Sequence, residues 1–242
     1  MFSPRKRLAA AALAGAACAL APAMASAGVV VSASGPSAGS FPVGKSIGNS
    51  ERIVLRAGDT LTVLDGNGTR VLRGAGTYSL GQQAGPSKRA SFAALTQRST
   101  ASRVGASASR GENPPRPSSL WYVDVSHPGT VCVLGTERVR LWRPETEGEA
   151  TYSLRAGAGG ASHDATFDDG ATLASWDTAA LPITDGASFA LAGPGGVGSG
   201  TLTFAVLGAA AEEPEALAQQ LIEKGCTQQL ELLSSETMIE ES

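Results

Sequence analysis

The sequence predicts a mostly β protein, in which a small β module is followed by an antiparallel β-sandwich and a short C-terminal helical segment. Three observations support this class. Apolar and polar residues alternate in short runs, which is typical of half-buried strands. In the second half these runs begin roughly every 9–15 residues and are separated by turn-forming residues, as in sandwich folds. A helical pattern of apolar residues is found near the C-terminus.

The first 27 residues are predicted to be a secretory signal peptide. A basic start is followed by a short apolar core over residues 8–22, too short for a comfortable membrane span. Small residues around Ala25 predict cleavage after Ala27. The protein is therefore expected in the periplasm or exported from a Gram-negative cell. The alternative is a lipoprotein anchored through Cys18.

Charge and length restrict the function classes. The 242 residues allow one large domain or two small ones, and the net charge is −3. Removing the signal peptide makes the chain more acidic, because its basic residues are Arg5, Lys6 and Arg7. An acidic chain is not expected to bind nucleic acid in general. No later segment is apolar for long enough to predict a transmembrane helix.

The β module is expected over residues 28–82. The run "GVVVSAS" opens it, and a tight turn is expected at Asp65-Gly66-Asn67-Gly68, since Asn-Gly tolerates positive φ. A second turn is expected at Gly74-Ala75-Gly76. Strands are predicted around alternating or paired apolar residues, which are Ile53, Leu55, Leu61, Val63, Val71, Leu72, Tyr78 and Leu80.

Residues 83–118 are expected to form a basic flexible linker, with one helical turn around Phe92–Gln97. The segment is rich in Ser, Ala, Gly and Pro and carries far more Arg than acidic residues. One interpretation is an arm that contacts an acidic partner or surface, and the other is a solvated spacer. The candidate contact residues in this segment are Arg89, Arg98, Arg103 and Arg110.

Residues 119–208 are predicted to form an Ig-like sandwich of about seven antiparallel strands. The aromatic residues Trp121, Trp142 and Trp176 are expected in its core or rim, with a carbohydrate-stacking platform as the alternative. The Gly-rich segment 193–198 matches GxGxxG but precedes a strand pattern, which favours a hairpin loop over a dinucleotide site.

Residues 209–242 are predicted to form a C-terminal helix, a second short helix in "CTQQLELL", and a frayed acidic tail. Pro214 suits the first turn of the first helix, and Gly225 suits the position just after its end. Export favours a disulfide between Cys132 and Cys226, which would attach this helix to the sandwich. Two separate buried thiols are the alternative.

The sequence predicts no catalytic residue, metal site or cofactor, and hence no enzyme. Of the two histidines, His127 is expected in a turn before Pro128, and His163 is adjacent to Asp164 on a predicted strand, so that these two side chains would point to opposite faces. No nucleophile elbow or HExxH motif is present. The run "HDATFDDG" lacks the ligand spacing of a calcium loop and indicates an acidic turn. An unrecognised hydrolase is the weaker alternative.

The stretch "LRAGDTLTVLDGNGTRVLRGAGTYSL" resembles the periplasmic domain of the FecR family. That family carries a repeat of the form G-D-x-φ-x-φ-L-D-G-x-G, followed by a strand and a G-x-G turn. The resemblance covers about residues 29–82 and implies a strand-rich module. In FecR-type regulators this domain follows a cytoplasmic segment and a membrane span that control a sigma factor, and the resemblance here extends to the β module alone. The matching residues are Gly58, Asp59, Leu61, Val63, Leu64, Asp65, Gly66, Gly68, Leu72, Gly74 and Gly76.

The expected function is therefore non-catalytic: binding or scaffolding of a protein partner in the periplasm. The hairpin turn Asp65–Gly68 and the arginines of the basic segment are the candidate contact residues. Glycan or peptidoglycan binding is the alternative.

Overall fold

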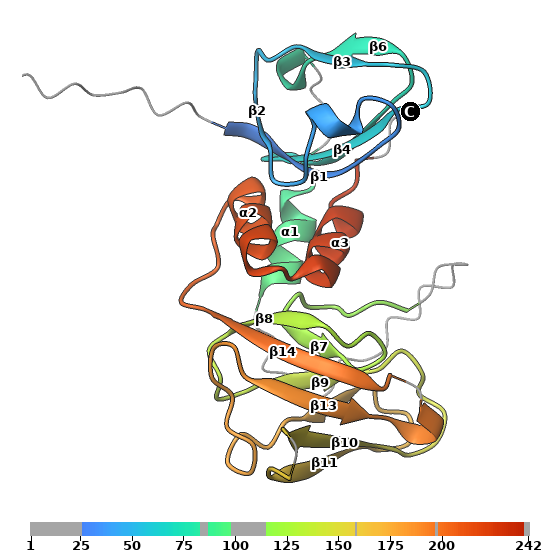
Figure 1. The fold of residues 1–242 in the computed structure, drawn as a ribbon, viewed down its shortest axis with the longest axis vertical. Helices are drawn as coiled ribbons and strands as arrows, with labels where there is room; N and C mark the ends of the chain where they lie inside the picture. The colour runs from blue at the N-terminus through green and yellow to red at the C-terminus, as the bar shows by residue number, and fades with distance from the viewer. Residues whose placement is uncertain (1–25, 83–86, 98–114, 158, 197, 240–242) are drawn as a thin grey trace, which may run out of the picture.

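The computed structural model describes residues 26–82, 87–97, 115–157, 159–196 and 198–239. Its elements stack in three layers along the longest axis: a β domain, a layer of three helices, and a second β domain (Figure 1). This confirms the mostly β class with a C-terminal helical segment. Residues 1–25 lie outside the described ranges, so the signal peptide, its cleavage and the lipid anchor at Cys18 remain predictions. Within the described part of the chain, no helix is long and apolar enough to cross a membrane.

The first β domain contains a four-stranded sheet of order β2-β1-β4-β5, with every neighbouring pair antiparallel, and a separate antiparallel pair, β3 with β6. Short 3₁₀ turns lie at Ala38–Ser40 and Leu80–Gln82. The strands are β1 (Ser26–Ser34), β2 (Ser46–Gly48), β3 (Ile53–Leu55), β4 (Thr60–Asp65), β5 (Gly68–Arg73) and β6 (Gly76–Tyr78).

Both faces of this sheet are buried around β1 and β4. Val30 and Val63 belong to the core of the first β domain, whereas Val29, Val31 and Leu64 pack into the core of the helical layer. Successive side chains of a strand point to opposite faces, so an uninterrupted apolar run places apolar groups on both. The valine run that opens the domain therefore joins two cores.

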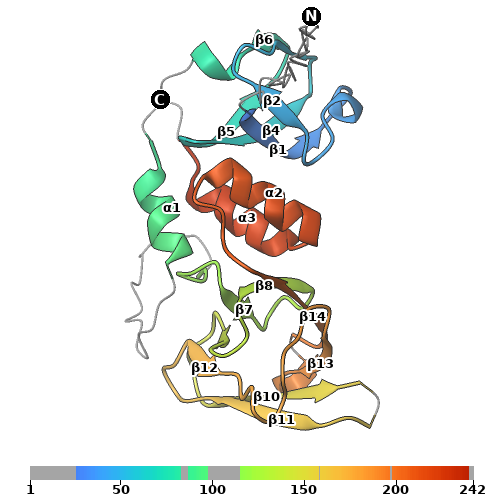
Figure 2. The same cartoon turned by 90° about the vertical axis from the view of Figure 1, so that its left-hand side faces the viewer.

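The helical layer consists of α1 (Arg89–Thr96), α2 (Pro214–Lys224) and α3 (Thr227–Glu236) (Figure 2). The eight residues of α1 correct the expectation of one helical turn in a flexible linker. Phe92 and Leu95 are buried in the same core as Leu217 and Leu221 of α2. This packing explains why a segment of linker-like composition forms a helix, since burial of apolar side chains stabilises short helices.

The end of α2 confirms the predicted cap and the predicted disulfide. Pro214 starts the helix, and Gly225 has φ 73°, the left-handed conformation that glycine adopts without steric cost. The next residue, Cys226, is bonded to Cys132, with 5.8 Å between their Cα atoms. The bond attaches the connection between α2 and α3 to the second β domain.

The second β domain is built from a five-stranded sheet, β11-β10-β13-β14-β8, and a three-stranded sheet, β12-β9-β7. Two neighbouring pairs, β14–β8 and β7–β9, are parallel, which corrects the expectation of a purely antiparallel sandwich. The pair β7–β9 is parallel because β8, between them in sequence, belongs to the opposite sheet. The strands are β7 (Tyr122–Asp124), β8 (Thr130–Leu134), β9 (Arg140–Trp142), β10 (Ala150–Ala156), β11 (Ser162–Phe167), β12 (Leu173–Ser175), β13 (Ser188–Ala192) and β14 (Gly200–Leu207).

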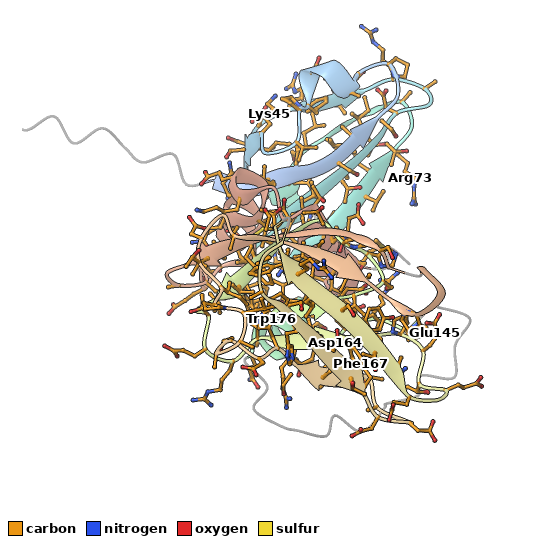
Figure 3. All side chains as sticks on the ribbon, turned by 60° about the horizontal axis from the view of Figure 1, so that its bottom comes forward. Lys45, Arg73, Glu145, Asp164, Phe167 and Trp176 are labelled. Atoms are coloured by element: carbon orange, nitrogen blue, oxygen red, sulfur yellow. A yellow bond between two sulfur atoms is a disulfide. The ribbon has the colours of Figure 1, made fainter. Side chains whose placement is uncertain are left out.

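Aromatic rings fill the core between these two sheets. Trp176 meets Phe189 and Phe204 edge to face, with ring centroids 4.9 and 5.2 Å apart. Figure 3 labels Trp176 and Phe167 within this domain, and Lys45 and Arg73 on the first. The antiparallel pairing of β13 with β14 confirms that the GxGxxG match is a hairpin loop. The three tryptophans are buried, with exposed fractions of 7% for Trp121, 5% for Trp142 and 4% for Trp176.

The C-terminal tail returns to the first β domain (Figure 1). The backbone N–H of Thr69 on β5 donates to the Thr237 carbonyl at 2.8 Å, and the Ile239 N–H donates to the Thr69 carbonyl at 2.9 Å. Ile239 is buried. These contacts correct the expectation of a fraying tail as far as residue 239, because pairing with the open edge of β5 satisfies backbone groups of the tail.

Candidate functional site

The predicted turn Asp65–Gly68 is formed by β4 and β5 and is stabilised from within. One Asp65 carboxylate oxygen accepts hydrogen bonds from the backbone N–H groups of Asn67 and Gly68, at 2.7 and 3.2 Å. Its other oxygen lies 3.1 Å from Arg70 Nε, and both side chains are buried. The Arg70 Nε–H is not aligned for a hydrogen bond, so the contact is an ion pair. The Asp65 carboxylate therefore stabilises the turn through contacts within the chain.

The outer side of this turn contacts the helical layer. The Gly66 carbonyl accepts from Arg89 Nε at 3.1 Å, and the Asn67 carbonyl accepts from the Lys88 N–H at 2.7 Å. Arg89 also pairs with Glu213 at 3.3 Å. The structure thus brings Arg89 together with the turn in an intramolecular junction. The other candidate arginines, Arg98, Arg103 and Arg110, lie outside the described residues, and a partner-binding role for the whole set stays a prediction.

A third carboxylate lies at this junction, on the first turn of α2. Burial raises the pKa of Glu215, and the nearby negative charges of Glu213 and Asp65 raise it further. One carboxylate oxygen of Glu215 is buried and has no hydrogen-bond partner among the described residues. The junction between the Asp65–Gly68 turn and the helical layer therefore contains a carboxyl group that resists ionisation.

The two histidines do not form a catalytic arrangement. His127 Nδ1 lies 3.0 Å from Asp124 Oδ2 and 3.0 Å from Ser126 Oγ, but the Ser126 hydroxyl and backbone N–H both bond to Asp124 Oδ1. All three residues belong to one turn, in which the carboxylate accepts from the backbone two residues on. A serine nucleophile would instead donate its proton to the imidazole. The geometry is that of a self-bonded turn.

On β11, His163 and Asp164 are adjacent and so point to opposite faces. Asp164 accepts a hydrogen bond from Ser153 Oγ at 2.6 Å. The acidic turn that follows is organised by the Arg143 guanidinium, which donates to the carbonyls of Asp168, Ala171 and Gly148. Over the part of the chain that the structure describes, no group of three or more His, Cys, Asp or Glu side chains could hold a metal ion.

A groove of about 350 Å³ lies between α3 and the edges of β7 and β8. We call it the α3 groove. Its size is within the usual range for pockets that bind ligands or peptide side chains. Polar and charged residues line it together with apolar ones. The lining residues are Pro115, Arg116, Pro117, Leu120, Tyr122, Asp124, His127, Thr130, Val131, Gln228, Gln229, Glu231, Leu232 and Ser235.

Tyr122 is the unusual member of this lining. Only 6% of the residue is exposed, yet its hydroxyl has no hydrogen-bond partner among the described residues. A buried hydroxyl without a partner costs about 1–3 kcal/mol. The ring also lines a neighbouring pocket of about 450 Å³ on the side of Trp121 and Trp176. The hydroxyl itself has almost no exposed area, so a bound molecule would recover the lost interaction only if the Tyr122 side chain turned toward the groove.

The floor of the groove is held rigid by Gln229. Its amide oxygen accepts from the Cys132 N–H at 2.6 Å, and its amide nitrogen donates to the carbonyls of Cys132 and Leu120 at 2.8 and 2.7 Å. Gln229 thus satisfies the open edge of β8 from the side of α3. A groove with a fixed floor offers a defined shape to an incoming segment.

Sequence reasoning did not find this groove. Its residues come from two distant stretches of the chain, 115–131 and 228–235, which the sandwich and α3 bring together. The signal that was present is weak: Gln228 and Gln229 interrupt the apolar pattern of α3, and Tyr122 adjoins Trp121 in an alternating strand. Comparison with known proteins finds no matching family model, no similar curated protein and no similar solved structure.

Proposed function

We propose that this chain is an exported, non-catalytic protein of the bacterial envelope, and that it binds a segment of a protein partner in the α3 groove. The first β domain would act as a FecR-like module that forms one body with the helical layer. The observation that carries the proposal is that a groove of about 350 Å³ is lined by Tyr122, whose buried hydroxyl has no hydrogen-bond partner among the described residues.

The groove suits a peptide segment better than a flat protein surface. Its volume accommodates one or two side chains, and the apolar residues Leu120, Val131 and Leu232 line it. Burial of apolar area against such a lining supplies affinity, while a hydrogen bond to Tyr122 supplies specificity. The carboxylates and the Tyr122 hydroxyl would then act as recognition groups and not as catalysts.

The glycan alternative receives no support from the tryptophans. Stacking on sugars requires an exposed aromatic face, but all three tryptophans are at most 7% exposed. Retention of the purified protein on isolated cell wall, with no protein partner present, would favour the glycan alternative over the peptide groove.

Photo-cross-linking in living cells tests the proposal. A photoreactive amino acid replaces Gln228 in the groove, and a control variant carries it at Thr166, which is exposed on β11. We expect one dominant protein to be captured from Gln228 and not from Thr166, and to be captured less when Tyr122 is also replaced by Phe. Equal capture at both positions would refute the proposal, and so would capture from Gln228 that is unchanged when Tyr122 is replaced by Phe.

A further inference from the structure

The charges around the α3 groove are unbalanced. Among the lining residues that the structure describes, the carboxylates are Asp124 and Glu231, and the one group that is always positive is Arg116. Arg116 already pairs with Glu236, which lies one residue beyond the lining residue Ser235, at 3.6 Å. Glu236 therefore matches the positive charge of Arg116, which leaves no always-positive group for the two lining carboxylates among the described lining residues.

The two carboxylates differ in how firmly they are held. The Asp124 side chain is 19% exposed, and it is fixed by Ser126 and His127. Glu231 is exposed on α3, and the structure shows no ion pair for it within the described residues. Glu231 is thus free to pair with an incoming cation beside the apolar lining.

We infer that the α3 groove selects peptide segments in which a lysine or arginine stands next to an apolar residue. The apolar side chain enters between Leu120, Val131 and Leu232, and the cation lies against Glu231 at the rim. A partner of opposite charge is favoured at such a rim, because like charges across an interface are repelled. This inference rests on the proposed function and specifies the chemistry of the partner segment.

Selection from a random heptapeptide library displayed on phage tests the inference, with the full-length mature protein as the target. The enriched peptides should contain Lys or Arg beside an apolar residue. The best of them should bind Glu231→Lys about tenfold more weakly, because reversal replaces attraction with repulsion. The control Glu149→Lys makes the same charge change at an exposed residue outside the groove lining and should leave affinity unchanged.

A charge-swapped peptide completes the experiment. Replacing its basic residue by Glu should abolish binding to the original protein and restore binding to Glu231→Lys. Enrichment of peptides without a basic residue, no enrichment, or equal weakening by both charge variants would overturn the inference. If the in-cell cross-link at Gln228 still captures a Tyr122-dependent partner, those outcomes refute only the charge preference and leave the proposed function standing.

Discussion

At the scale of single residues, the amide of Gln229 closes the edge of the five-stranded sheet. It makes three hydrogen bonds to backbone groups of Cys132 and Leu120. A leucine at this position would fill a similar volume but would leave one N–H and two carbonyl groups buried without partners. Side-chain amides that serve an edge strand in this way join α3 to the second β domain more specifically than apolar contact does.

Replacing Gln229 by Leu is therefore expected to lower the free energy of unfolding by about 2–4 kcal/mol, since each unpaired buried group costs about 1–3 kcal/mol. Urea unfolding followed by tryptophan fluorescence measures the change. Gln228→Leu, on the next position of the same helix, is the matched control and should change stability by less than about 0.5 kcal/mol. A similar loss in both variants would contradict the role assigned to Gln229.

Glu215 is expected to make the stability of the protein depend on pH. Burial, together with Glu213 and Asp65, raises the pKa of Glu215 in the folded protein above its ordinary value of 4.5. The folded state then binds the proton more tightly than the unfolded state does. Protonation of Glu215 therefore contributes to the free energy of unfolding. This contribution is complete below the ordinary pKa and is lost as pH rises through the raised pKa of the folded protein.

The variant Glu215→Gln should remove this part of the pH dependence. Its free energy of unfolding should decline less than that of the unmodified protein as pH increases from about 4 toward neutrality. Thermal unfolding at a series of pH values measures the difference, and Glu223→Gln on the exposed side of α2 is the control. Parallel stability curves for the Glu215 variant and the unmodified protein would show that this carboxyl group is not perturbed.

The residue scale also shows where sequence reasoning reached its limit. It predicted the turn at Asp65–Gly68, in which Gly68 has a positive φ of 144°. It could not show that a Cβ on Gly68 would lie 2.5 Å from the Thr237 carbonyl, because that contact joins residues from opposite ends of the chain. The α3 groove was missed for the same reason.

At the scale of elements, the disulfide attaches the connection between α2 and α3 to β8, and α2 begins at Pro214 and ends before Gly225, as the sequence predicted. Local signals were sufficient there, since Pro214 and Gly225 mark the ends of α2 independently of the rest of the fold. The helix α1 and the parallel pairs β14–β8 and β7–β9 depend on tertiary packing. No local pattern specifies which strands become neighbours.

The bond between Cys132 and Cys226 closes a loop with a sequence separation of 94. The chain-entropy model assigns such a loop about 4–5 kcal/mol of stability. Unfolding by guanidinium with and without reductant should show a loss on this scale, and the double variant Cys132→Ser with Cys226→Ser should reproduce it without reductant. If reduction leaves the midpoint unchanged, the helices are held to β8 by packing alone.

At the scale of the whole molecule, the helical layer serves both β domains. Its core includes Val29, Val31 and Leu64 from the first domain and Cys132, Ala205 and Leu207 from the second. A domain that shares its core with its neighbour loses apolar burial when that neighbour unfolds. The division into separate modules, which the sequence suggests, understates this coupling.

The two β domains are accordingly expected to unfold in one transition. Hydrogen exchange of β4 and β5 reports on the first domain. Tryptophan fluorescence reports on the second domain through Trp142 and Trp176, and on the helical layer through Trp121, which packs against α1. Both signals should give the same urea midpoint. Opening of β4 at a clearly lower concentration of urea would show that the first domain is an independent unit.

The central claim is that the Tyr122 hydroxyl contributes to binding of a partner and not to the stability of the fold. The direct measurement is Tyr122→Phe, with stability and partner capture from position 228 compared in the same protein. Removing a buried hydroxyl that has no partner should leave the free energy of unfolding unchanged or higher by up to about 1–3 kcal/mol, while capture falls several-fold. A loss of stability with unchanged capture would contradict the claim and would assign the hydroxyl a structural role.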